Sequence, residues 1–118
     1  MNFIRKLFAP ASPEAMSAAK EKAQKIIDEN AVAVFSKSYC PHCRASKQLL
    51  NSLGAKYFLI ELDQVDDGAD IQAALHELSG QKTVPNIYIA QKHIGGNSDL
   101  QAQSGLKATL KGLGALEE

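Results

Sequence analysis

The chain has 118 residues, 45% of them hydrophobic, which is the size and composition of one domain with its own core. Thirteen basic residues balance thirteen acidic ones. A formal charge of zero removes the general electrostatic attraction to phosphate, so we expect no nucleic-acid partner. No apolar run approaches the roughly 20 residues that span a bilayer, so we expect no membrane partner.

Residues 1–13 are predicted to be an N-terminal extension, and residues 14–118 the folded domain. Arg5 and Lys6 stand among four large apolar residues in this extension, which has no acidic residue. Transit peptides are basic and amphipathic, so the segment is a weak signal for a mitochondrial location, although a frayed or locally packed extension is the commoner explanation. Two cysteines without a disulfide framework suit a reducing compartment, and we expect the cytoplasm.

Helical and extended patterns alternate along the chain. Ser12, Pro13 and Glu14 read as a cap, a first-turn proline and a dipole-favoured acid, so a helix is predicted from there to about residue 30. The apolar run Ala31–Ser36 predicts a strand that is covered on both faces. The later predicted elements are a helix from Pro41 to Gly54, a strand at 56–62, a helix from Asp66 to Gly80, strands at 86–89 and 92–94, a short helix near Asp99 capped by Asn97 or Ser98, and a helix at 106–113.

The only two cysteines, Cys40 and Cys43, follow the first predicted strand. Cys40 takes the N-cap of the next helix and Pro41 its first position, where the missing N–H costs nothing. The positive end of the helix dipole favours an anion there, and Lys37 and Arg44 add positive charge. We therefore expect a nucleophilic thiolate at Cys40 and, one turn later, a second sulfur within disulfide reach.

Two other roles for this pair are weaker. A structural disulfide across so short a loop stabilises by only about 2 kcal/mol, and a chain of this size can build a core without it. A structural zinc site wants four Cys or His ligands in paired spacing, whereas only His42 accompanies the cysteines. His76 and His93 stand alone, and we interpret both as surface or edge histidines. The pattern favours redox chemistry and predicts no metal site.

The order strand, helix, strand with a Cys-x-x-Cys at the first crossover is typical of the thioredoxin-like fold. We expect an α/β domain with a four-stranded mixed central sheet and helices on both faces. The last two strands are separated by Ala90 and Gln91, a poor two-residue turn because type I′ favours Asn-Gly and similar pairs with positive φ. The predicted hairpin therefore rests on its flanking strands.

Three motifs in this order and spacing closely resemble the dithiol glutaredoxins: Cys40-Pro41-His42-Cys43, Thr83-Val84-Pro85 and Gly95-Gly96-Asn97-Ser98-Asp99. The resemblance runs from about residue 14 to 113. Thioredoxin itself fits less well, because it carries a tryptophan before its first cysteine and Gly-Pro between the two, and this chain has no tryptophan. His42 departs from the tyrosine that is more common in the family at this place.

The resemblance implies a glutathione groove beside Cys40. It makes Pro85 a cis proline that faces the cysteines, and the backbone of Val84 the partner of the cysteinyl part of glutathione, as in a short antiparallel strand. The residues that it assigns to glutathione are Lys37, Ser38, Tyr39, Cys40, Pro41, His42, Gln72, Lys82, Thr83, Val84, Pro85, Ser98 and Asp99.

The two ends of glutathione are assigned by the same resemblance. Lys37 and Gln72 would bind the glycine carboxylate, with Lys82 assisting, whereas Ser98 and Asp99 would hold the γ-glutamyl end. Glutathione has two carboxylates and an amine, and these positions offer cations, a helix N-terminus and an anion. Taken singly, each is more simply a solvated, surface or capping residue, and only their arrangement around one cysteine favours binding.

The implied activity is that of a glutathione-dependent thiol–disulfide oxidoreductase. Cys40 would be the nucleophile that reduces protein–glutathione mixed disulfides, and Cys43 would resolve the reaction with protein disulfides. We expect glutathione as co-substrate, glutathionylated or disulfide-containing proteins as partners, and a monomer. The alternative is a dimer that binds a [2Fe–2S] cluster through the first cysteine and glutathione, as some glutaredoxins do. Pro41 counts against it, because cluster-binding relatives usually carry a smaller residue there.

Overall fold

The computed structural model describes residues 12–117. A central sheet has the strand order β2-β1-β3-β4. β1 (Val32–Ser36) runs parallel to β2 (Phe58–Glu61) and antiparallel to β3 (Asn86–Ile89), which pairs antiparallel with β4 (Lys92–Gly95). This is the four-stranded mixed sheet of the predicted thioredoxin-like fold, and the prediction is confirmed.

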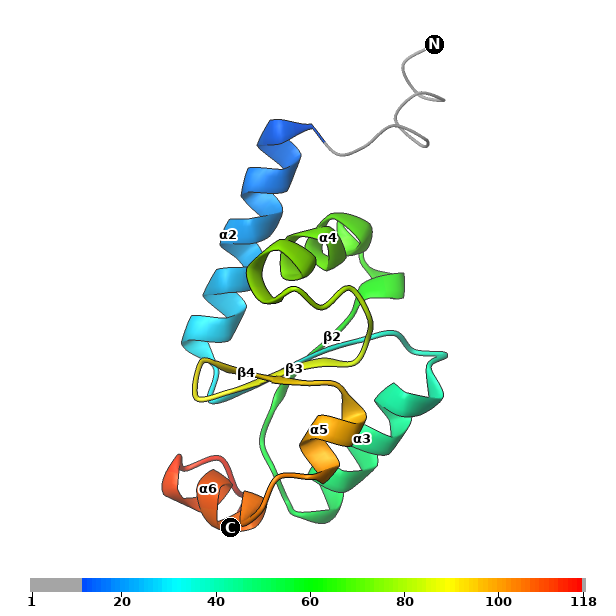
Figure 1. The fold of residues 1–118 in the computed structure, drawn as a ribbon. Coiled ribbons are helices and arrows are strands. Elements are labelled where there is room, and N and C mark those ends of the chain that lie inside the picture. Colours follow the sequence, from blue (N-terminus) through cyan, green and yellow to red (C-terminus); the bar gives the residue numbers. More distant parts are fainter. Residues whose placement is uncertain (1–11, 118) are drawn as a thin grey trace.

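Helices cover both faces of the sheet (Figure 1). α2 (Pro13–Glu29) and α4 (Gly68–Ser79) pack together on one face. α3 (Pro41–Ser52), α5 (Asn97–Gln101) and α6 (Leu106–Gly112) lie on the other. None of the helices within residues 12–117 has the length and apolar composition that a membrane crossing requires.

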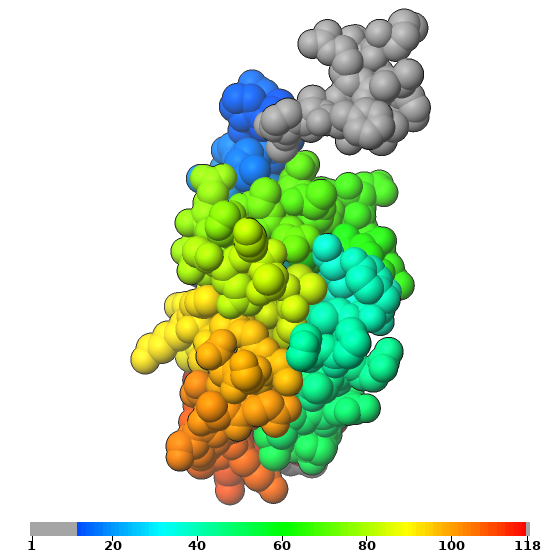
Figure 2. Space-filling model, turned by 45° about the vertical axis from the view of Figure 1, so that its right-hand side comes forward, coloured from blue at the N-terminus to red at the C-terminus, as the bar shows by residue number. Residues whose placement is uncertain are grey.

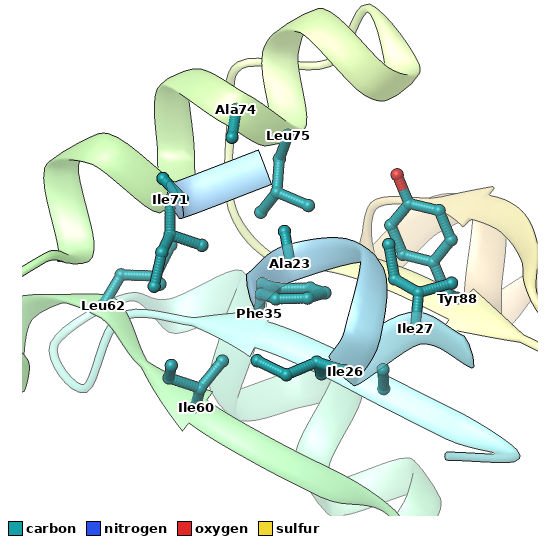
Figure 3. Packing of buried hydrophobic residues seen from close by; sticks show 12 residues of the cluster. Ala23, Ile26, Ile27, Phe35, Ile60, Leu62, Ile71, Ala74, Leu75 and Tyr88 are labelled. Atoms are coloured by element: carbon teal, nitrogen blue, oxygen red, sulfur yellow. The ribbon is translucent and has the colours of Figure 1, made fainter. Parts of the chain in front are cut away.

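β1 supplies side chains to a separate hydrophobic cluster on each face. Phe35 points toward α2 and α4, whereas Val34 points toward the helices of the other face, because successive strand residues alternate. Figure 3 shows Phe35 among side chains of α2, α4 and β2, and its ring makes an edge-on contact with Tyr88 at 6.1 Å between centroids. All five residues of β1 are buried, as predicted for a strand covered on both sides.

Element ends follow local hydrogen bonds that the residue pattern does not reveal. The strand predicted at 56–62 is shorter, because Leu62 already opens a 3-10 turn, η1 (Leu62–Gln64), and the N–H of Lys56 donates to Ala115 near the C-terminal end (2.7 Å). The predicted cap of α5 was wrong. Gly96 is the N-cap, and its N–H donates to the Asp99 carboxylate (3.0 Å).

The predicted start of the first helix is confirmed at α2. Ser12 caps this helix, since its Oγ accepts a hydrogen bond from the N–H of Ala15 (3.1 Å), as predicted. The targeting hypothesis concerns residues 1–11, which lie outside the described residues.

Candidate active site

Cys40 stands at the N-cap of α3, as predicted. Its Sγ accepts a hydrogen bond from the N–H of Cys43 (3.3 Å), which is the contact that a capping Ser or Asp oxygen usually makes. The N–H of Cys40 donates a hydrogen bond to the backbone carbonyl of Lys37 (3.1 Å), and the carbonyl of Cys40 accepts one from the backbone N–H of Arg44 (3.0 Å). Because Cys40 is only partly buried, a reactant can approach its sulfur.

Cys43 lies in a different environment from Cys40. Both are free thiols, but Cys43 is completely buried. Burial raises the pKa of the Cys43 thiol, because the thiolate loses its hydration there. The two thiols therefore differ in burial, since Cys40 is partly accessible and Cys43 is enclosed.

A groove of about 440 Å³ lies beside Cys40. Its walls join the three motifs that the sequence singled out, and Figure 2 shows the face where their segments, coloured cyan to teal, yellow-green and orange, meet. The Val84–Pro85 peptide bond is cis, and the Val84 carbonyl oxygen lies 3.8 Å from the Sγ of Cys40. The lining residues are His42, Thr83, Val84, Pro85, Gly96, Asn97 and Ser98.

The loop that precedes Cys40 is hydrogen-bonded to η1. Both the N–H of Ser38 (2.9 Å) and its hydroxyl donate to the Asp63 carboxylate, and these bonds lower the pKa of Asp63. Lys37 lies in the same loop, and Tyr39 projects from it with 66% of its surface exposed. Sequence reasoning missed Asp63. The available signal was that parallel strands end at the same edge of a sheet, so an acid just after β2 lies beside the loop that follows β1.

Two of the three residues that were predicted to bind the glycine carboxylate, Gln72 and Lys82, are in contact. The Gln72 side-chain Nε2 donates to the Lys82 carbonyl (2.8 Å), which brings α4 against the loop before Pro85. Ser98 lines the groove, and Asp99 holds the N–H of Gly96. Of the residues that were predicted to bind the two ends of glutathione, Ser98 is the one that lines the groove.

α3 and α5 are joined by a hydrogen bond that the sequence did not suggest. The buried Ser46 hydroxyl donates to the Oδ1 of Asn97 (2.9 Å), which fixes the start of α5 beside the active-site helix. Gly96 and Asn97 were not among the predicted binding residues, although both belong to the third motif. Within residues 12–117 no group of three or more His, Cys, Asp or Glu side chains is placed to hold a metal ion.

Comparison with known proteins agrees with this geometry. Residues 32–94 match the family model described as glutaredoxin. The chain belongs to the glutaredoxin family. A glutaredoxin of Vernicia fordii is 57% identical over 75 residues, which are 64% of this chain and 72% of the relative. Glutaredoxin-C2 of Arabidopsis thaliana is 46% identical over 101 residues, which are 83% of this chain and 91% of the relative.

Solved glutaredoxin structures show the same fold. The crystal structure of a buckwheat glutaredoxin–glutathione complex has a TM-score of 0.87 and 43% identity, and the match covers 91% of this chain and 100% of that one. With its Cys40–Cys43 pair, this glutaredoxin is a thiol–disulfide oxidoreductase.

Proposed function

We propose that this glutaredoxin takes its electrons from glutathione and reduces both protein–glutathione mixed disulfides and protein disulfides. The observation that carries the proposal is the position of the accessible Cys40 sulfur, 3.8 Å from the Val84 carbonyl at the edge of the groove. An extended peptide with a cysteine at its centre fits such a backbone. The buckwheat relative, crystallised as a glutathione complex, supports the choice of tripeptide.

Reduction of a mixed disulfide needs Cys40 alone. Its thiolate attacks the glutathione sulfur, the protein thiolate leaves and takes up a proton, and Cys40 carries the glutathione. The thiolate of a second glutathione then attacks that glutathione sulfur. Glutathione disulfide leaves, and Cys40 is a thiolate again.

Reduction of a protein disulfide needs both cysteines. Cys40 attacks one substrate sulfur and forms a mixed disulfide, and the other substrate sulfur leaves as a thiolate. Cys43 then loses its proton and attacks the Cys40 sulfur, which releases the second substrate thiol and leaves a Cys40–Cys43 disulfide. Cys43 suits this second step because it is buried and its N–H contacts the Cys40 sulfur. Two glutathione molecules reduce the disulfide and become glutathione disulfide.

In this proposal the remainder of glutathione is bound by backbone groups of the groove and by charged and polar residues near it. The Val84 carbonyl would accept a hydrogen bond from the cysteinyl N–H. Lys37, with Gln72 and Lys82, would hold the glycine carboxylate, and Ser98 and Asp99 the γ-glutamyl end. These assignments are supported by the position of Ser98 in the groove wall and by the contact between Gln72 and Lys82.

The test is an assay in which glutathione reductase and NADPH recycle glutathione disulfide. The wild type, Cys40→Ser and Cys43→Ser are each given a glutathionylated protein and a protein disulfide. We expect Cys40→Ser to lose both activities and Cys43→Ser to lose only the second. Equal loss of both activities in Cys43→Ser would contradict the assigned roles. A brown protein with visible absorbance after anaerobic purification would instead favour the cluster-binding dimer.

A further inference from the structure

Gln81 holds the two carbonyl groups on either side of Val84. Its side-chain Nε2 donates to the Thr83 carbonyl (3.1 Å) and to the Pro85 carbonyl (2.9 Å). The side-chain amide of Gln81 thus donates two hydrogen bonds to the backbone of the groove wall. Gln81 does not line the groove, and no sequence motif singled it out.

A second glutamine completes this arrangement. Gln72 donates to the Lys82 carbonyl (2.8 Å), so the carbonyls of residues 82, 83 and 85 each accept a hydrogen bond from a side-chain amide. Among the hydrogen bonds of residues 12–117, the Val84 carbonyl has only its contact with the Cys40 sulfur. The Val84 carbonyl is therefore the one carbonyl of residues 82–85 that no side-chain amide of the described residues holds, and it lies beside the Cys40 sulfur.

Gln81 is itself anchored to the end of α4. Its backbone N–H donates to the Ser79 Oγ (3.1 Å), and that hydroxyl donates to the Leu75 carbonyl (2.8 Å). The buried Asn86 reaches the same hydroxyl over 3.5 Å. Because Leu75 is buried in the core, the amide of Gln81 acts from a fixed support rather than from a free loop.

We propose that Gln81 is a positioning residue for glutathione: it holds Thr83 and Pro85 so that the Val84 carbonyl faces the ligand backbone beside Cys40. This inference rests on the proposed function of the groove. The Val84–Pro85 peptide lies between the two peptide groups whose carbonyls Gln81 holds, so this part of the loop is organised before the ligand arrives. The cysteinyl N–H of glutathione then finds its acceptor in place, and less binding free energy is spent on ordering.

The test replaces Gln81 by Met, which keeps the length of the side chain and removes both N–H donors. We expect the KM for glutathione in the coupled assay to rise roughly tenfold, as the loss of well-placed hydrogen bonds would produce. The rate at which iodoacetamide alkylates Cys40 should change less than about twofold, because this reagent needs no groove. Gln81→Glu, which stays polar but also lacks the donors, should raise the KM in the same way.

The control is Gln24→Met on α2, which removes a side-chain amide hydrogen bond to Asp28 far from the groove motifs in the chain. Its KM should equal that of the wild type. An unchanged KM for glutathione in both Gln81 variants would overturn the inference. A rate of Cys40 alkylation that falls by the same factor as the KM rises would also overturn it, because the substitution would then disturb the site as a whole. A wild type that shows no dependence on glutathione would overturn the proposed function itself, which is a distinct result.

Discussion

The N–H of Cys43 donates a hydrogen bond to the Sγ of Cys40 across 3.3 Å, so the buried cysteine holds the sulfur of the partly accessible one before any disulfide forms. The same geometry suits the step that we propose for Cys43, its attack on the Cys40 sulfur. Residues three apart on a helix share a face, and Cys43 needs little backbone movement to reach the Cys40 sulfur. What separates the two thiols is burial, which leaves Cys40 partly accessible and Cys43 enclosed.

Resolution by Cys43 should depend strongly on pH. Burial raises the pKa of the Cys43 thiol, and only the thiolate attacks, so its reactive fraction grows as the pH rises toward that pKa. We expect release of substrate from a preformed Cys40 mixed disulfide to accelerate by up to about tenfold between pH 7 and pH 8. Rapid quenching with acid, followed by mass spectrometry, measures this rate. In Cys43→Ser the intermediate should persist, and a wild-type rate that is flat over this range would argue against resolution by Cys43.

Asp63 should stabilise the active-site loop in a pH-dependent way. Its hydrogen bonds from Ser38 lower its folded-state pKa below the ordinary value of 3.8, so this contribution is complete above that value and is lost as the pH falls through the folded pKa. Asp63→Asn should therefore unfold at lower urea concentration than the wild type at pH 7, and the difference should shrink below pH 3.8. Asp66→Asn, an exposed neighbour outside the Ser38 contacts, is the control. A pH-independent gap between Asp63→Asn and the wild type would exclude the carboxylate as its cause.

Gly68 is required for the contact between α4 and η1. A Cβ at this position would stand 1.7 Å from the Leu62 carbonyl oxygen, which is backbone and cannot turn aside. We expect Gly68→Ala to lower the free energy of unfolding by about 2–4 kcal/mol, measured by urea denaturation. Gly112→Ala, where a Cβ meets no atom within 4 Å, should leave stability unchanged or slightly raise it. Similar losses in both variants would mean that the close approach to Leu62 is not the reason.

Substitutions of Asp99 and Gln72 should affect the binding of glutathione more than the chemical step. Asp99→Asn keeps an oxygen for the N–H of Gly96 but loses the negative charge that would pair with the α-amino group of glutathione. Gln72→Ala removes the contact with Lys82. Each should raise the KM for glutathione by about five- to tenfold and change kcat less. Asp28→Asn, whose carboxylate accepts from Gln24, should match the wild type. If kcat fell while the KM stayed constant, neither residue would belong to the binding site.

The sequence reveals the parts of the fold that depend on local pattern. The apolar run of β1 and the cap and proline at α3 were sufficient to place the sheet and Cys40, because burial on two faces and helix initiation each leave a distinct residue pattern. The hairpin turn between β3 and β4 was harder to predict from the sequence. Ala90 and Gln91 adopt positive φ angles of 52° and 68°, which the strands impose against the preference of both residues.

Most of the site residues that the sequence did not reveal make contacts across long sequence separations. Asp63 meets Ser38 only because two parallel strands end together, and Asn97 meets Ser46 only because α5 packs on α3. Gln81 is close in sequence to the residues that it holds, but its role follows from which carbonyls it reaches. The position of Asp63 directly after a parallel strand indicates only that it lies near the loop after β1, and the Asn97 and Gln81 contacts have no residue pattern of their own, so the partners become known only from the folded structure.

The most direct measurement is the site of glutathione attachment. Cys43→Ser is mixed with glutathione disulfide, digested and mapped by mass spectrometry, with Cys40→Ser treated in parallel. The account predicts one glutathionyl group on Cys40, which added glutathione removes, and none on the buried Cys43 of the second variant within the same time. Attachment to Cys43 at a comparable rate, or a Cys40 that stays unmodified, would contradict it.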